Sequence, residues 1–156
     1  MPEIVSRQVT ALTGTATSPG KMRPSDAGGR VRTVVVTSPA TAAWANGDTI
    51  ASGFKLPIGT RFLASSFVSN AAMGASVVLD VGIRNFDTKV AIDADGIAAA
   101  LSVASAGRSA LNSGALVAAG AESRTTEISE VYATLSGATP TANAQIRIEV
   151  QYVCDD

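Results

Sequence analysis

The stretch Gln145–Val153 alternates strictly between apolar and polar residues. A period of two predicts a β-strand with one face on a core and the other face toward polar surroundings. Strands that are buried on both faces have continuous apolar runs instead, so the alternation favours an antiparallel sheet. The expected inward face carries four apolar side chains, those of Ile146, Ile148, Val150 and Tyr152.

Further stretches of strand character follow one another at a spacing of about ten residues, with turn signals between them. They are residues 31–37, 49–56, 61–69, 76–84 and 126–135. The first contains the β-branched run Val34–Val36, which is typical of strands. This rhythm predicts an all-β fold, either an antiparallel β-sandwich or a jelly roll.

Two of these stretches predict which side chains face the core, and a third predicts a pairing. Alternation in 49–56 places Phe54 on the same face as Leu56. Residues 126–135 and 145–153 are separated by a turn that contains Gly137 and Pro140, which predicts a hairpin. In 76–84 the expected inward residues are Val77, Leu79, Val81 and Ile83.

The segment 90–107 is ambiguous in its period. Asp95 could cap a short helix through Ile97–Ala104, with Gly107 as its end. Apolar residues in this segment do not settle the period, so a strand stays an alternative. The sequence thus predicts at most one short helix.

Residues 1–30 are rich in Thr, Ser, Pro, Gly and Ala and offer few apolar anchors. They are interpreted as an extended N-terminal arm ahead of one domain, residues 31–156. In an assembling protein such an arm would reach a neighbouring subunit, whereas in a monomer it would be a tail.

The net charge is −1, so no overall field draws the chain to nucleic acid or to an anionic membrane. The N-terminal region departs from this balance, since residues 1–32 contain five basic and two acidic residues. We expect this basic region to contact an acidic protein surface rather than nucleic acid, because it lacks interleaved aromatic residues. Its basic residues are Arg7, Lys21, Arg23, Arg30 and Arg32.

Only 16% of the residues are charged, whereas an average soluble domain has about 25%. Such a chain has few groups with which to cover its exterior, so we expect a homo-oligomer, a dimer or a trimer, with part of the surface covered by other subunits. A monomer with a surface of Ser, Thr and Ala is the alternative. Trp44, the one tryptophan, would either plug the end of the sandwich or anchor an interface.

Residues for catalysis are scarce. There is no histidine, and the one cysteine, Cys154, is interpreted as an incidental thiol near the terminus. Asp93 opens a stretch like a calcium loop, but the twelfth position, which needs a glutamate, is Ala104. Glu127 and Glu130 are interpreted as solvated charges. We therefore expect no enzyme activity, no metal and no cofactor.

The sequence shows no secretory signal, and its longest apolar patch is too short and interrupted to cross a bilayer. We expect synthesis in a cytoplasm and no membrane partner.

Five segments carry a resemblance to small structural proteins of tailed-phage virions, most closely to head-decoration (cement) proteins. These segments are Asn46–Ile50, Lys55–Thr60, Gly74–Gly82, Val131–Ala138 and Ile146–Val153. The resemblance implies a non-enzymatic jelly-roll or sandwich subunit of the virion, made in the host cytoplasm. It would bind the major capsid protein and copies of itself, and would stabilise the assembled head. A tail or fibre component, or a receptor-binding module, is the alternative.

Overall fold

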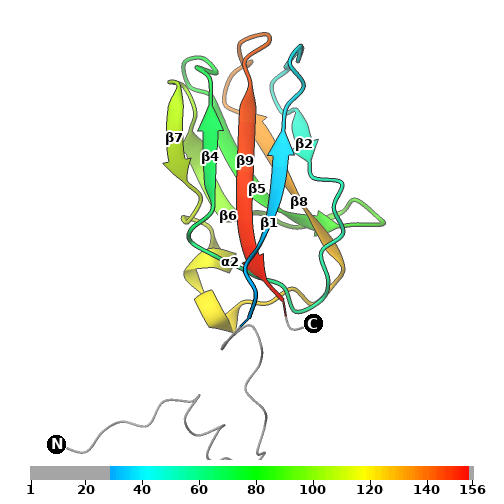
Figure 1. The fold of residues 1–156 in the computed structure, drawn as a ribbon. Coiled ribbons are helices and arrows are strands. Elements are labelled where there is room, and N and C mark those ends of the chain that lie inside the picture. Colours follow the sequence, from blue (N-terminus) through cyan, green and yellow to red (C-terminus); the bar gives the residue numbers. More distant parts are fainter. Residues whose placement is uncertain (1–28, 155–156) are drawn as a thin grey trace, which may run out of the picture.

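The computed structural model describes residues 29–154, which fold into two antiparallel β-sheets packed face to face (Figure 1). The strands are β1 (Arg32–Thr37), β2 (Thr49–Ala51), β3 (Arg61–Phe62), β4 (Phe67–Asn70), β5 (Val78–Asn85), β6 (Ala91–Ser102), β7 (Gly107–Ala110), β8 (Ser129–Ser136) and β9 (Ile146–Val153). Two short helical segments, α2 (Ala115–Ala118) and the 3-10 helix η1 (Gly120–Glu122), lie between β7 and β8.

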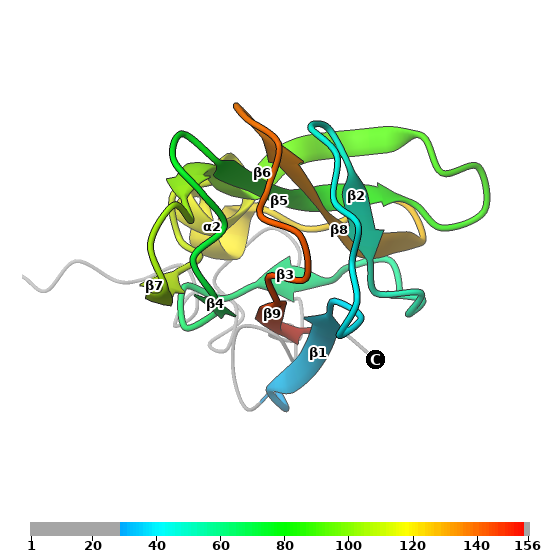
Figure 2. The same cartoon turned by 90° about the horizontal axis from the view of Figure 1, so that it is seen from above.

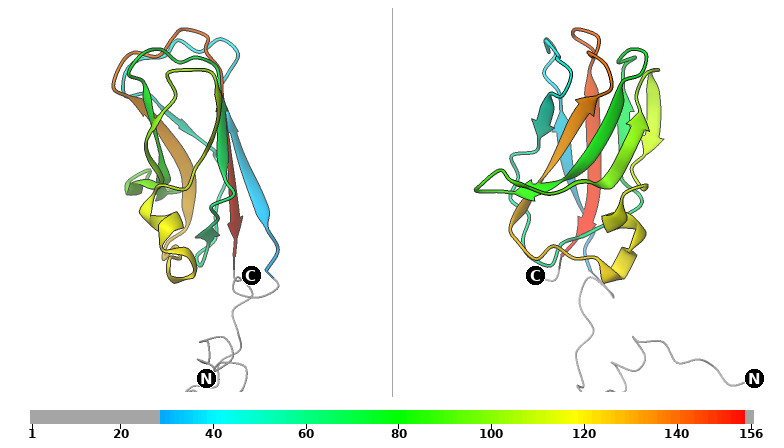
Figure 3. Two further views of the ribbon diagram at one scale, coloured as in Figure 1. Left: turned by 90° about the vertical axis from the view of Figure 1, so that its left-hand side faces the viewer. Right: turned by 180° about the vertical axis from the view of Figure 1, so that it is seen from behind.

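The strand order is that of a jelly roll. The first sheet has the order β1-β9-β4-β7, with β3 also paired to β9, and the second sheet has the order β2-β8-β5-β6. The chain passes repeatedly from one sheet to the other, and only β5 and β6 form a hairpin within a sheet. Figures 2 and 3 show the two layers from above and from the side. The predicted all-β antiparallel fold is therefore confirmed.

The core lies between the sheets, and the two best-predicted strands, β9 and β5, contribute to its centre. On β9 the four alternating apolar residues expected to face inward are 3% exposed or less, and β9 pairs with β1 on one side and with β3 and β4 on the other. The four inward residues predicted around β5 are 1% exposed or less. Period-two alternation thus identified both central strands correctly.

The helix predicted at Ile97–Ala104 is wrong, because this segment belongs largely to the strand β6. Its pairing with β5 is interrupted by three register shifts, which mark β-bulges. The longest bulge folds over Gly82, where an added Cβ would lie 2.0 Å from the carbonyl oxygen of Asp93. The bulges and the small side chains of this strand hide its period. Within residues 29–154, the one α-helix is instead the four-residue α2.

The predicted hairpin between the last two strands is also wrong. β8 lies between β2 and β5 in the second sheet, whereas β9 belongs to the first. The connection between them crosses from sheet to sheet at one end of the sandwich (Figure 1). Apart from β5 and β6, strands that follow one another in sequence do not pair with each other in this topology.

The strand predicted at 49–56 ends early. β2 stops at Ala51, and Gly53 has a φ of +63°, a conformation that glycine adopts readily. This residue resets the alternation, so Phe54 is 51% exposed while Leu56 is fully buried. The stretch 61–69 is likewise divided by a turn into β3 and β4.

Candidate interaction surface

The predicted basic contact residues fall into two groups. Arg7, Lys21 and Arg23 lie outside the described residues. Arg30 is exposed just ahead of β1, and Arg32 is half-buried at the start of this strand. The Arg32 Nη1 group donates a hydrogen bond to Sγ of Cys154 at 2.7 Å.

This contact changes the interpretation of Cys154. Its side chain is buried and belongs to the hydrophobic core, so it is not the incidental terminal thiol expected from the sequence. The start of β1 and the end of β9 therefore meet at a packed contact.

Trp44 lies in the connection between β1 and β2. It is half-buried and packs against the core, and its Nε1–H donates to the carbonyl oxygen of Ala144 at 2.9 Å. These contacts tie two connections together at one end of the sandwich, as the plug interpretation expects.

A shallow groove of about 410 Å³ opens beside the start of β1, between this strand and the segment after β2. Five of its seven lining residues are apolar, and the other two are the cations Arg32 and Lys55. The apolar residues are Phe54, Leu56, Pro57, Ile128 and Tyr152. Ile58, next to the groove in sequence, is 59% exposed.

The tip of the β5–β6 hairpin adjoins this groove through Lys55, whose Nζ lies 5.3 Å from the centre of the Phe86 ring. The tip carries two further exposed apolar side chains, Val90 at 64% and Ile92 at 42%. We call the groove, Ile58 and the hairpin tip, residues 85–92, the lateral surface. Figure 1 shows this hairpin projecting from the same side of the sandwich as the segment after β2.

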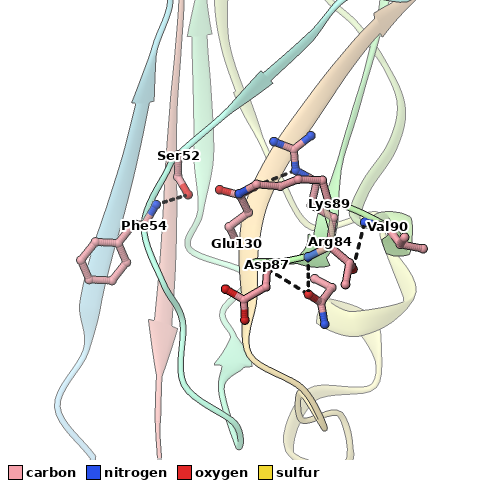
Figure 4. A network of polar contacts seen from close by, with 9 residues as sticks. Ser52, Phe54, Arg84, Asp87, Lys89, Val90 and Glu130 are labelled. Atoms are coloured by element: carbon pink, nitrogen blue, oxygen red, sulfur yellow. Dashed lines mark hydrogen bonds and ion pairs between the residues drawn. The ribbon is translucent and has the colours of Figure 1, made fainter.

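Local hydrogen bonds fix the hairpin tip (Figure 4). Oδ1 of Asn85 accepts from the backbone N–H groups of Asp87 and Thr88, both at 3.0 Å. Lys89 has a φ of +60°, and its Nζ lies 4.4 Å from the centre of the Phe86 ring. Val90 is thus presented on an ordered turn.

A buried ion pair joins the tip to β8. The carboxylate of Glu130 is 1% exposed and accepts from Nε of Arg84 at 2.8 Å and from Nζ of Lys89 at 2.7 Å. Burial raises the pKa of Glu130, but the hydrogen bonds and charges of Lys89 and Arg84 outweigh burial and hold this pKa below its usual value.

The two glutamates that the sequence presents as solvated charges therefore differ. Glu130 is a structural anchor, which corrects that interpretation. Glu127 is exposed, and its Oε2 accepts from Nδ2 of Asn85 at 2.8 Å.

A second group of acids lies around the β6 bulge. Burial, and then a hydrogen bond with Asp95, raises the pKa of Asp93. Oδ1 of Asp80 accepts from the backbone N–H of Ala100 at 2.7 Å. Within residues 29–154, no three His, Cys, Asp or Glu side chains gather as a metal site.

Sequence reasoning missed the exposed apolar residues of the lateral surface. A local signal was present, because Phe54 follows Gly53 and Ile58 precedes Gly59, and both glycines adopt positive φ. Apolar residues beside such turns do not follow strand alternation, so they need not face the core. None of the helices in the described part of the chain is long and apolar enough to span a bilayer.

No protein-family model and no curated protein matches this chain. Two solved structures share its fold. A chain of the capsid of Ralstonia phage GP4 aligns with a TM-score of 0.65 and 16% identity, over 82% of this chain and 86% of that one. A chain of the cyanophage Pam1 capsid asymmetric unit aligns with a TM-score of 0.56 and 20% identity, over 99% of both. The chain therefore has the same jelly-roll fold as chains found in two phage capsids.

Proposed function

We propose that this chain is a non-enzymatic structural protein of a bacteriophage virion, and more specifically a decoration (cement) subunit that binds and stabilises the assembled head. The observation that carries the proposal is the fold shared with chains from two phage capsids, in one case over 99% of both chains. Fold alone does not specify function, so the surface must supply a fitting contact.

The lateral surface supplies such a contact. Its four exposed large apolar side chains are 42–64% exposed, although the chain has few charges overall. Exposed apolar residues that gather on one side are typical of protein interaction sites. Arg32 and Lys55 at the groove add positive charge, which suits an apolar and acidic patch on the major capsid protein.

The first experiment locates the chain in the virion by antibody-label electron microscopy on particles of the source phage. Dense, regular labelling of the head supports the proposal. Labelling confined to the tail favours the tail or fibre alternative. Absence of labelling on both intact and opened particles contradicts a virion role.

The second experiment tests the surface itself. Heads stripped of this protein are mixed with the purified chain, and bound protein and resistance to heat are measured. The double variant Phe54→Ser, Ile58→Ser is expected to bind at least about tenfold more weakly, because it removes two apolar anchors. Phe67→Ser is the matched control, since Phe67 lies on the outer face of the first sheet under Arg108, whose Cζ is 3.5 Å from the ring centre. Equal binding by the double variant and the control would remove the lateral surface from the proposal.

The N-terminal region is tested separately by deleting residues 1–29, which removes Arg7, Lys21 and Arg23. In the proposal these residues add contacts to an acidic capsid surface, so the shortened chain is expected to fold and to lose its hold on the particle. Full retention on the particle would contradict this part of the proposal.

A further inference from the structure

The strand β1 lies at an edge of the first sheet. Its six residues pair with β9 in continuous register, from Arg32 opposite Tyr152 to Thr37 opposite Arg147. Among the described residues, no strand pairs with its other side. Edge strands in proteins are usually protected by Lys, Pro, bulges or a covering segment, because free backbone groups invite pairing with another chain. Residues 33–37 contain no charge, proline or register shift.

The register shows which backbone groups of β1 point outward. The N–H of Ser38 donates to the carbonyl oxygen of Ile146 at 2.9 Å, so these two residues form a hydrogen-bonded pair. Hydrogen-bonded and non-bonded pairs alternate in an antiparallel ladder, so Val36 and Val34 also bond toward β9. The N–H and C=O groups of the intervening residues, Thr33, Val35 and Thr37, therefore point away from β9.

Hydrogen bonds on the side of β9 that faces away from β1 agree with this assignment of inward and outward groups. The carbonyl oxygen of Gln151 accepts from the N–H of Leu63 at 2.9 Å, and that of Gln145 accepts from Ala71 at 2.9 Å. Odd-numbered residues of β9 thus bond away from β1, and even-numbered residues bond toward it.

The sequence of this edge is its own mirror image. Residues 33–37 are Thr-Val-Val-Val-Thr, centred on Val35. In an antiparallel pair of two identical strands, this order places Val35 opposite Val35 and Thr33 opposite Thr37. Pairs of β-branched residues and pairs of threonines are favourable across antiparallel strands.

We propose that two copies of this chain associate through their β1 strands, which pair antiparallel about a twofold axis at Val35. The three outward residues of one strand then pair with those of the other, which gives about six backbone hydrogen bonds in total across the interface. Arg32 lies opposite Ser38 of the second copy, so no like charges oppose each other at the strand pair. The two first sheets become one continuous sheet across the dimer. This inference concerns the purified chain and is independent of the proposed role in the virion.

A pair of six-residue strands buries less surface than the roughly 1,200–2,000 Å² of a standard stable interface. We therefore expect a dimer that dissociates on dilution in the micromolar range. This strength is within reach of sedimentation equilibrium.

The register is tested by cysteine cross-linking of the full chain. Cα atoms of a hydrogen-bonded antiparallel pair are about 5.5 Å apart, within the range of a disulfide. Val35→Cys is therefore expected to form a covalent dimer under oxidising conditions. Thr33→Cys is the matched control, because its two copies lie about 14 Å apart, and it should cross-link only when mixed with Thr37→Cys. The unsubstituted chain controls for the buried Cys154.

Association is tested by sedimentation equilibrium on the full chain, Val35→Lys and Val35→Glu. Each variant places two like charges at the twofold axis, and we expect dimerisation to weaken by about tenfold or more. An equimolar mixture of the two variants is expected to regain dimers, because opposite charges then meet. A monomeric parent chain at every concentration would overturn the proposal, and so would unchanged association of both variants. If dimers formed only after deletion of residues 1–28, that segment rather than a second copy would occupy the β1 edge in the full chain. This result would also overturn the proposal.

Discussion

The two longest edge strands in the described part of the chain, β1 and β6, differ in how regular their unpaired backbone edge is. β1 is six residues long and keeps one register along its whole length. β6 has twelve residues, three register shifts and a residue with positive φ, Ala100. Bulges bend and twist a strand, so the backbone groups of β6 do not form a straight row that another strand could pair with. Of these two edges, β1 is therefore the one whose backbone is regular enough to pair with a further strand.

The irregular edge is held in place by close packing. An added Cβ at Gly82 would meet the backbone of Asp93 and Ala94, the nearest atom at 2.0 Å. Oδ1 of Asp80 on β5 accepts a hydrogen bond from the backbone N–H of Ala100 at 2.7 Å. The bulge is therefore fixed by specific contacts with β5.

The substitution expected to have the largest effect is Gly82→Ala. The new methyl group has no room unless the bulge moves, so we expect a loss of about 3 kcal/mol of unfolding free energy, at the top of the range for overpacking. Urea unfolding measures this loss. Gly107→Ala on β7 is the control, because no atom lies within 4 Å of its added Cβ, and it should change stability by less than about 1 kcal/mol. Similar losses for both variants would show that the close approach at Gly82 is unimportant.

The same contrast explains what the sequence can predict. β9 and β5 lie in the middle of their sheets, where burial forces strict alternation, and their inward residues were correctly predicted. β6 lies at an edge with bulges of several residues, so its faces interchange along the strand and no period survives. The lateral surface was missed for a related reason, because the positive φ of Gly53 turns Phe54 outward.

Pairing between distant strands could not be derived from local patterns. Proximity in sequence predicted a β8–β9 hairpin, but β9 pairs with β1, which lies more than a hundred residues earlier. Such long-range pairing depends on how both sheets share one core rather than on the turn between two strands.

The next largest effect is expected at the buried ion pair that anchors the β5–β6 hairpin. Glu130→Gln keeps the shape but removes the charge that Arg84 and Lys89 approach, and we expect a loss of about 2 kcal/mol at pH 7. The loss is moderate because the side chains of Arg84 and Lys89 are 20% and 48% exposed and can be hydrated.

The ion pair also sets the sign of a pH dependence. The pKa of Glu130 is lowered in the folded chain, so its contribution is complete above the usual glutamate pKa of about 4.3 and is lost as the pH falls through the lowered value. Urea unfolding from pH 7 to pH 3 should therefore show the difference between the parent chain and Glu130→Gln shrinking with acid. A constant difference across this range would contradict the assignment.

A smaller effect of opposite sign, a gain in unfolding free energy, is expected on the bulged edge strand β6. The pKa of Asp93 is raised by burial and by the hydrogen bond with Asp95, so its ionised form costs stability above that raised value. Asp93→Asn should gain about 0.5 kcal/mol at pH 7. This gain should disappear as the pH falls below the usual aspartate pKa of about 3.9, where the parent carboxyl is protonated in both states. A variant less stable than the parent at pH 7 would show that the carboxylate supports the bulge.

The smallest change in the unfolding free energy of the monomer is expected on the regular edge strand β1. Val35 is 46% exposed on the outer face of β1, so Val35→Lys should change the unfolding free energy of dilute protein by less than about 0.5 kcal/mol. The parent chain, however, gains stability from any dimer it forms, so its Tm should rise with protein concentration. The Tm of Val35→Lys should stay constant over the same range, as measured by calorimetry at several concentrations. If the Tm of both proteins depended on concentration in the same way, the regular edge of β1 would be no more prone to pairing than the bulged edge of β6.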